Sequence, residues 1–368
     1  MNKKRILILG NSYLVVFKFR GELINKLVDE GHDVWTCFPN GPFGEGMESA
    51  KKYGCHFIEN HIDRRGTNPL KDIFLMKEYL TIIKKIKPDV VLAYTVKPDV
   101  YGGIICRFLK IPFLPNITGL GKALDENGIV RKFTILLYRI AVKKAQCVFF
   151  QNSSDKDFFD KNRIIYPKGI VLPGSGVNLK KFQPLPYPKE TEPIRFIFVG
   201  RVMKAKGIEQ FFDAAHRIKE MFPKIEFHIC GYCEENYKEA IEKRSKSGEI
   251  VYHGLVNDVR IFEKPCHCIV LPSFHPEGIS NVLLEAAASA RPVITTDHVG
   301  CKETVTDGVT GFIVKQRDSA DLIKKMLEFI QLPYDEKVRM GLNGRKKMES
   351  EFNRQIVVDS YVKEMNLI

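Results

Sequence analysis

The chain has 368 residues, 44% of them hydrophobic and 27% charged, which is enough for two globular domains of ordinary size. Its 57 Lys and Arg exceed its 44 Asp and Glu, so the formal charge is +13, and we expect an anionic partner such as a phosphorylated substrate or an anionic lipid surface. Neither finger-type Cys/His spacing nor an aromatic ribonucleoprotein-type strand is evident, which argues against a nucleic-acid partner. No apolar run reaches the roughly 18 residues that a membrane span needs, and we expect a cytoplasmic protein.

The first half of the chain alternates strand-like apolar runs with amphipathic segments of helical length. The runs at 6–9 and 90–93 are apolar throughout, as expected for strands covered by helices on both faces. This alternation predicts βαβ units around a parallel sheet. We predict strands at 5–9, 33–38, 89–94 and 112–117, and helices at 18–30, 73–86 and 100–109.

A proline-rich segment separates the two halves. Five prolines from Leu172 to Pro193 disrupt periodic structure and indicate an extended connector. The alternation then begins again, with a strand at 194–199, a helix at 206–220 and a strand at 225–229. We therefore predict an α/β fold of two doubly wound, Rossmann-like domains with a cleft between them. The predicted boundaries are 1–175 for the first domain, 176–193 for the linker, 194–350 for the second domain, and 351–368 for a C-terminal helix that packs back on the first domain.

The nine cysteines lie mostly inside apolar runs, which is typical of reduced thiols packed in a core. Cys230-Gly-Tyr-Cys233 and Cys266-His-Cys268 have spacings that a zinc site or a redox pair would also use. Both patterns fall at or inside predicted strands. We interpret them as core residues and expect no metal site.

The most informative segment, 271–314, contains a strand end, a loop with Glu277 and Gly278, and a helix that begins near Ser280 or Asn281. The free backbone N–H groups in the first turn of a helix, together with the helix dipole, form a seat for a diphosphate. We assign that seat to the N–H groups of Asn281, Val282 and Leu283.

Two acids lie on either side of that seat in the sequence. Glu277 precedes it and Glu285 lies about one helical turn into the helix, so the carboxylates can flank a bound diphosphate. One can hold sugar hydroxyls and the other a ribose. Taken by themselves, the two glutamates could instead be a helix-capping acid and a solvent-exposed helix residue. The surrounding loop favours a binding site.

A second loop, 199–207, follows the first strand of the second domain and carries three cations. Gly200 allows a sharp turn, and Arg201 and Lys206 are predicted at the start of the next helix. Arginine can bind phosphate with two hydrogen bonds and lysine acts as a compact charge, so the pair can neutralise a leaving diphosphate. We interpret Lys204 as a solvated surface charge.

These two elements resemble family 4 of the retaining glycosyltransferases, which have the GT-B fold. The resemblance covers nearly the whole chain and is strongest over 200–314, where the E-x7-E segment is continued by ARPVITTD and DGVTGFIV. It implies that Arg201 and Lys206 bind the diphosphate. It also implies that Glu277 contacts the donor sugar and that Glu285 binds the ribose. Basic residues and helix N–H groups then replace a metal ion, so no cofactor is expected. The residues given a catalytic role are Glu277, Arg201 and Lys206.

The resemblance extends to the loops that would hold the nucleotide. Gly254 and Leu255 resemble the family's base-binding loop, and Gly231 resembles a glycine near the nucleotide, with a simple strand-end turn as its alternative. The implied donor-binding residues are Glu285, Gly278, Ile279, Ser280, Asn281, Val282, Leu283, Gly231, Gly254 and Leu255.

The first domain resembles transferases that build bacterial capsules and lipid-linked oligosaccharides, through its segments 116–121 and 176–184. It departs from the family pattern in two places. Many members have a glycine pair where this chain has Asn11 and Ser12 after Gly10, and many have a histidine near Asn116 or Thr118. The loop residues expected to meet donor or acceptor are Gly10, Asn11, Ser12, Asn116, Thr118 and Gly119.

The resemblance implies a hexosyl- or N-acetylhexosaminyltransferase of polysaccharide biosynthesis that retains the anomeric configuration. The implied donor is a UDP-linked sugar, and the implied acceptor, bound by the first domain, is a saccharide on polyprenyl diphosphate. Segment 129–144 joins apolar residues with five basic ones, which suits an anionic membrane surface, although a packed helix with a solvated basic edge fits equally well. We expect peripheral contact with the inner face of the membrane.

Three other interpretations stay open. The protein transfers sugar to a soluble acceptor, or it is a nucleotide-sugar epimerase of the same fold, or it is a non-catalytic basic module that binds nucleic acid or membrane. An epimerase would need several acids and histidines around one carbon. A non-catalytic binding module would account for the positive charge but would not explain the combination of Arg201, Lys206, Glu277 and Glu285.

Overall fold

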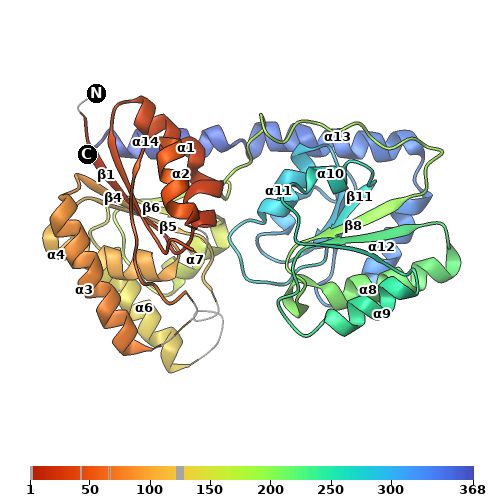
Figure 1. The fold of residues 1–368 in the computed structure, drawn as a ribbon, viewed down its shortest axis with the longest axis horizontal. Helices are drawn as coiled ribbons and strands as arrows, with labels where there is room; N and C mark the ends of the chain where they lie inside the picture. The colour runs from red at the N-terminus through yellow and green to blue at the C-terminus, as the bar shows by residue number, and fades with distance from the viewer. Residues whose placement is uncertain (1–2, 42–43, 65, 67, 122–127) are drawn as a thin grey trace. The chain divides into compact units, whose positions relative to one another are not determined.

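The computed structural model describes residues 3–41, 44–64, 66, 68–121 and 128–368, which divide into two compact units (Figure 1). The first unit comprises the described residues up to Ser175 together with Pro276–Gly278 and Arg354–Ile368. The second comprises Gly176–His275 and Ile279–Asn353. This division differs from the predicted domains, because residues 276–278 group with the first unit instead of the second.

Residues 176–193, predicted as a linker, belong to the second unit. The Val177 N–H donates to the carbonyl of Phe352 at 2.8 Å, and the Tyr187 hydroxyl donates to the carbonyl of His267 at 3.0 Å. The prolines leave the segment without helix or strand, but these bonds still hold it on the unit.

The first unit contains a seven-stranded sheet in the order β3-β2-β1-β4-β5-β6-β7, and every pair in it is parallel. Its strands are β1 (Arg5–Leu9), β2 (Asp33–Cys37), β3 (His56–Ile58), β4 (Val90–Tyr94), β5 (Phe113–Ile117), β6 (Val148–Phe150) and β7 (Gly169–Val171). Its helices are α1 (Phe19–Asp29), α2 (Glu45–Tyr53), α3 (Pro69–Ile86), α4 (Gly103–Leu109), α6 (Ile129–Ala141), α7 (Ser153–Lys161) and α14 (Arg354–Met365).

Helices cover both faces of this sheet, which explains its uniformly apolar strands. Ile6 and Ile8 of β1 pack with residues of α1 and α14, whereas Leu7 and Leu9 pack with residues of α3, α4 and α6. Successive side chains of a strand point to opposite faces, so each face needs its own apolar set. The predicted layer of helices on each side is confirmed.

The second unit contains a six-stranded parallel sheet in the order β10-β9-β8-β11-β12-β13. Its strands are β8 (Arg195–Val199), β9 (Glu226–Cys230), β10 (Val251–Gly254), β11 (Cys268–Leu271), β12 (Val293–Thr296) and β13 (Gly311–Val314). Its helices are α8 (Ile208–Met221), α9 (Lys238–Lys246), α10 (Arg260–Glu263), α11 (Asn281–Ala288), α12 (Ser319–Gln331) and α13 (Tyr334–Glu351). Both sheets reverse their strand order on either side of the first strand, so the predicted pair of doubly wound domains is confirmed.

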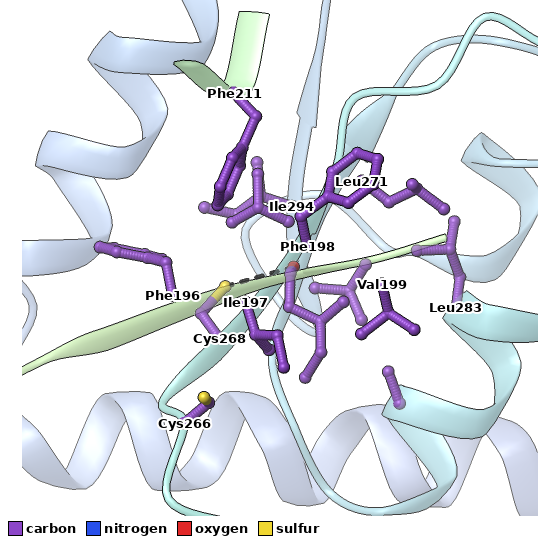
Figure 2. Close-up of a cluster of buried hydrophobic side chains, with 14 of the residues drawn as sticks. Phe196, Ile197, Phe198, Val199, Phe211, Cys266, Cys268, Leu271, Leu283 and Ile294 are labelled. Atoms are coloured by element: carbon purple, nitrogen blue, oxygen red, sulfur yellow. Dashed lines mark hydrogen bonds between the residues drawn. The ribbon is translucent and has the colours of Figure 1, made fainter. Parts of the chain in front are cut away.

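The core of the second unit places cysteines among apolar side chains (Figure 2). Cys268 pairs with Phe196 of β8 and donates a weak thiol hydrogen bond to the carbonyl of Ile269 at 3.5 Å. Burial raises the pKa of Cys266 to about 12 and raises that of Cys268 well above its ordinary value. All nine cysteines are free, and these two behave as small core residues, as the sequence indicated.

Several predicted helices begin elsewhere in the structure. The segment predicted as one helix over 100–109 contains a π-helical turn, η2 (Pro98–Gly102), before α4. The helix predicted over 206–220 begins only at Ile208, after a 3-10 turn, η3 (Lys204–Lys206). Gly207 separates the two with φ of 80°, and a side chain there would lie 2.1 Å from the Pro272 carbonyl oxygen. No helix within the described ranges has the length and apolar character that crossing a membrane requires.

Candidate active site

The loops at the carboxyl edge of the second sheet lie against one another. β8 is flanked by β9 and β11, and because all three are parallel their following loops emerge at the same edge. Main-chain bonds join these loops: the Val202 N–H donates to the Tyr232 carbonyl and the Phe274 N–H donates to the Ala205 carbonyl, both at 2.9 Å. The backbone therefore fixes the loops that carry the predicted site.

Gly231 allows two of these loops to approach closely. Its N–H donates to the Gly254 carbonyl at 2.7 Å, its φ is 153°, and a Cβ would lie 1.7 Å from the carbonyl oxygen of Gly200. Main-chain packing therefore requires a glycine at this position, which supports the interpretation of Gly231 as a strand-end turn. The predicted position of Gly231 near a nucleotide stays a prediction. Leu255, beside Gly254, is 75% exposed and presents an apolar side chain from the loop predicted to bind the base.

Arg201 follows β8 and is held by an acid of the neighbouring loop. Its Nη1 lies 2.6 Å from Oε2 of Glu234, and its Nη2 lies 3.0 Å from Nε2 of His275. The sequence placed Arg201 at the start of a helix, which is wrong, because it lies in the loop before η3. A partly exposed guanidinium fixed by a carboxylate remains able to bind a phosphate with its other N–H groups.

Lys206 and Lys204 occupy different environments although both lie in η3. Lys206 is only 7% exposed, whereas the side chain of Lys204 is 66% exposed and pairs with Glu209 at 3.3 Å. The interpretation of Lys204 as a surface charge is confirmed. Lys206 lies in the 3-10 turn and not in the first turn of α8, where the sequence placed it, because Gly207 interrupts the helix.

The predicted diphosphate seat corresponds to the N-terminus of α11, and its role in binding stays a prediction. Ser280 is the N-cap, but its side chain makes no capping bond, so it leaves the first N–H groups of the helix to other partners. The Ser280 N–H donates to the Gly300 carbonyl at 2.8 Å, and the Thr295 hydroxyl donates to the Leu271 carbonyl at 2.8 Å. Buried Ile279 and Leu283 anchor the turn in the core. The positive end of the helix dipole at Asn281 is thus fixed at the carboxyl edge.

Glu285 lies on α11 with its side chain turned into the unit. It is 7% exposed and is close enough to Glu263 of α10 for its charge to raise the pKa of that carboxyl. It also raises the pKa of Arg260. The sequence paired Glu285 with Glu277 around a diphosphate, but Glu277 groups with the first unit and Glu285 with the second.

Arg291, from the ARPVITTD motif, has a structural role. It is fully buried and donates to the carbonyls of Leu185, Pro186, Glu263 and Lys264 at 2.7–3.2 Å. The motif therefore holds residues 185–186 against α10.

In the first unit, the loop after β5 holds Glu277 and Gly278. The Gly278 N–H donates to the Thr118 carbonyl at 3.1 Å, and Asn152 Nδ2 donates to the Gly278 carbonyl at 3.0 Å. Gly119, with φ of 114°, lies so close that a Cβ would be 3.0 Å from the Gly278 nitrogen. The structure thus brings together four predicted residues: Thr118, Gly119, Glu277 and Gly278.

The other predicted residues of the first unit have different environments. Gly10 follows β1 and donates to the Cys37 carbonyl at 3.0 Å, and Asn11 and Ser12 continue the same loop. Asn116 lies in β5, inside the strand predicted over 112–117, and is only 1% exposed, although it was grouped with the loop residues expected to meet donor or acceptor. Its Nδ2 donates to the Tyr361 hydroxyl at 2.6 Å, so its side chain is committed to packing against α14.

The sequence analysis missed a buried polar cluster around Asn116. Arg20 of α1 lies 4.3 Å from the ring centre of Tyr94, and Tyr94 and Tyr361 are both fully buried. Asp99 of η2 is also fully buried, and burial raises the pKa of its carboxyl well above the usual range. These residues come from separate elements, and each lies in an ordinary local pattern, so no sequence signal singled them out.

Two family models match the two halves of the chain. Residues 5–152 match the model described as glycosyl transferase 4-like, and residues 180–347 match the model described as glycosyl transferases group 1. The second match contains the whole segment from η3 to α11 on which the site was predicted.

The chain is similar over almost its whole length to named bacterial transferases. It is 25% identical, over 98% of this chain and 97% of the relative, to the N,N'-diacetylbacillosaminyl-diphospho-undecaprenol alpha-1,3-N-acetylgalactosaminyltransferase of Campylobacter jejuni. It is 26% identical, over 86% of this chain and 84% of the relative, to the UDP-Gal:alpha-D-GlcNAc-diphosphoundecaprenol alpha-1,3-galactosyltransferase of Escherichia coli.

A solved structure shares the fold. The Anabaena protein Alr3699/HepE, crystallised in complex with UDP and glucose, matches with a TM-score of 0.78 at 13% identity, over 99% of this chain and 100% of that one. The two parallel sheets, the glycosyltransferase model matched by each half of the chain and the named relatives all indicate the same family. The chain is a glycosyltransferase of the family 4 type with the GT-B fold.

Proposed function

We propose that the protein transfers a hexose or N-acetylhexosamine from a UDP-sugar to a saccharide carried on polyprenyl diphosphate, with retention of the anomeric configuration. The observation that carries the proposal is the carboxyl edge of the second sheet, where Arg201, Lys206 and the N-terminus of α11 all lie on joined loops. Such an edge is suited to a nucleoside diphosphate, because two cations and a helix dipole favour the same anion.

The proposed reaction exchanges one bond for another at the anomeric carbon. The bond from this carbon to the β-phosphate oxygen breaks, and the acceptor hydroxyl oxygen bonds to the same face of the carbon. The hydroxyl proton passes to the departing phosphate oxygen. No protein nucleophile takes part, so the enzyme acts through fixed positive charge on the leaving group and through positioning of the substrates.

We assign the charge stabilisation to residues of the second unit and the sugar contact to Glu277. Arg201 and Lys206 neutralise the leaving diphosphate, with the N–H groups at Asn281 as further donors. Glu285 accepts hydrogen bonds from the ribose. Arg201, Lys206 and the helix N–H groups supply the positive charge that a metal ion would otherwise provide. We therefore propose a metal-independent reaction.

The acceptor proposal rests on the names of the relatives and on an exposed surface of the first unit. Both named relatives act on sugars linked to diphosphoundecaprenol. Helices α3, α4 and α6 lie next to one another in this unit (Figure 1). Together they expose nine large apolar side chains, which we call the apolar surface: Leu70, Ile73, Phe74, Phe108, Ile129, Val130, Phe133, Leu136 and Ile140.

Exposed cations lie beside part of the apolar surface. Phe74 is 71% exposed, Phe108 is 75% and Ile129 is 87%. A single exposed apolar side chain is normal, but several on neighbouring helices favour an interaction surface. The exposed cations Lys132, Arg139, Lys143 and Lys144 lie on or directly after α6. Exposed apolar side chains with cations on the same helix suit a bilayer with anionic headgroups. We propose peripheral contact with such a bilayer, which would present a lipid-linked acceptor.

The direct test is transfer by the purified protein. It is incubated with UDP-, GDP- and dTDP-sugars, with and without a bacterial lipid extract that contains polyprenyl-diphosphate saccharides, and release of nucleoside diphosphate and lipid-extractable sugar are measured. We expect UDP release that depends on the extract, and an α-linked product from an α-linked donor. Transfer to water-soluble saccharides alone would indicate a soluble acceptor, and an epimerised donor without transfer would replace the proposal by an epimerase.

A further inference from the structure

Glu263, at the end of α10, is a buried carboxyl group that the proposed reaction does not use directly. Its exposure is 0%, and neither side-chain oxygen has a hydrogen-bond partner within the described residues. A buried carboxylate without a partner is costly, so such a group is retained as the neutral acid or is stabilised by a nearby cation.

The nearby cations are already committed to other groups. Arg291 uses its guanidinium on four main-chain carbonyls, including the carbonyl of Glu263 itself. Arg260 makes bonds of 2.6 and 2.8 Å to the carboxylate of Asp258 and one of 2.7 Å to the carbonyl of Lys181. Neither cation is therefore bonded to the Glu263 carboxyl, which favours its neutral form.

Two acids, Glu285 and Asp258, are close enough for their charges to act on Glu263. Burial first, and then the charge of Glu285, raise the pKa of Glu263 to about 8, while Asp258 acts in the same direction and Arg291 and Arg260 oppose it. The thiols of Cys230 and Cys266 also face this carboxyl, and burial raises the pKa of each to about 12, so both stay neutral in this range. Ionisation of Glu263 would therefore add a second negative charge in a region where another acid already acts on it, which favours its neutral form.

We propose that Glu263 is a positioning residue for Glu285: as the buried neutral acid it places no like charge near the Glu285 carboxylate, and its ionisation weakens nucleotide binding. This inference rests on the proposed role of Glu285 toward the ribose. A single carboxylate on Glu285 accepts hydrogen bonds from sugar hydroxyls. A second charge behind it repels the first carboxylate and the nucleotide diphosphate.

The effect of pH on stability has a defined sign. The folded-state pKa of Glu263 is raised to about 8 from an ordinary 4.5, so its contribution is fully present below pH 4.5 and is lost as pH rises toward 8. E263Q cannot ionise and should keep that contribution. The melting temperature of E263Q minus that of the wild type should therefore increase from pH 5 to pH 8 and then level off.

The test measures UDP binding and thermal unfolding between pH 5 and pH 9 for the wild type, E263Q, E285Q and the double variant. We expect wild-type affinity for UDP to fall roughly threefold to tenfold from pH 7 to pH 9. E263Q should retain near wild-type affinity at pH 7 and lose this fall. Because the two acids are coupled, the pH-dependent stability gain of E263Q should shrink in the E285Q background.

The outcomes separate this inference from the proposed function. Identical pH profiles of UDP binding in E263Q and the wild type would overturn the inference. So would a stability gain that is the same with and without Glu285, since a purely structural role predicts that result. If UDP binds none of the proteins, the UDP-transferase proposal fails, and the stability cycle still decides whether Glu263 acts on Glu285.

Discussion

Different kinds of contact lie at the carboxyl ends of the strands in the two sheets. In the second unit the loops after β8 and β11 are joined by main-chain bonds and carry Arg201, Lys206 and the start of α11. In the first unit, the ends of β4 and β5 are covered by buried side chains, with Asn116 bonded to Tyr361 of α14. Fixed loops with cations suit an anionic ligand, whereas buried side-chain contacts mainly stabilise the fold. Variants in the two regions should therefore separate transfer from stability.

The largest effect is expected for Lys206, with Lys204 as the matched control in the same turn. K206A removes a mostly buried cation that we assign to the leaving diphosphate, and kcat/KM should fall at least about 100-fold, or about 2.7 kcal/mol. K204A removes a 66% exposed lysine and should change kcat/KM less than about twofold. Both are assayed as UDP release with lipid extract, alongside thermal unfolding. Equal losses in the two variants would contradict the assignment.

A smaller effect is expected at the apolar surface of the first unit. The double variant I129S/F133S should bind vesicles of phosphatidylglycerol and phosphatidylcholine about tenfold more weakly, since two side chains only partly removed from water contribute about 1 to 2 kcal/mol. L342S, which changes an apolar residue of the second unit that is 47% exposed, serves as the control. Vesicle sedimentation measures both. Unchanged binding of the double variant would exclude this surface as the contact.

The smallest effect concerns the buried cluster of the first unit. Y361F removes the hydroxyl that Asn116 bonds at 2.6 Å, and the free energy of unfolding should fall by about 1 to 2 kcal/mol. Y334F, whose hydroxyl donates to the Pro188 carbonyl at 3.1 Å in a half-buried position, should cost about 0.5 kcal/mol or less. Urea denaturation compares the variants, and UDP affinity should stay unchanged in both. A loss of UDP binding in Y361F with normal stability would assign a ligand role to the cluster.

The sequence by itself determined the two doubly wound sheets and the helix start at which we propose the diphosphate seat. Strands such as β1 and β4 are short, uninterrupted apolar runs, and the predicted helix start near Ser280 or Asn281 corresponds to α11. These features depend on local patterns of apolar residues, glycine and N-cap residues, which a single sequence records. Lys204 was likewise predicted correctly as an exposed charge, whereas Lys206 in the same turn is buried and its function stays a prediction.

Only the tertiary structure decided where side chains from distant elements meet. It bonded Asn116 to Tyr361, 245 positions away, and brought Glu285 close enough to Glu263 for their charges to interact in the second unit. It also grouped residues 276–278 with the first unit and delayed the start of α8, because Gly207 packs against the Pro272 carbonyl. Contacts of this kind depend on how strands and helices are ordered in space, and local periodicity carries no information about that order.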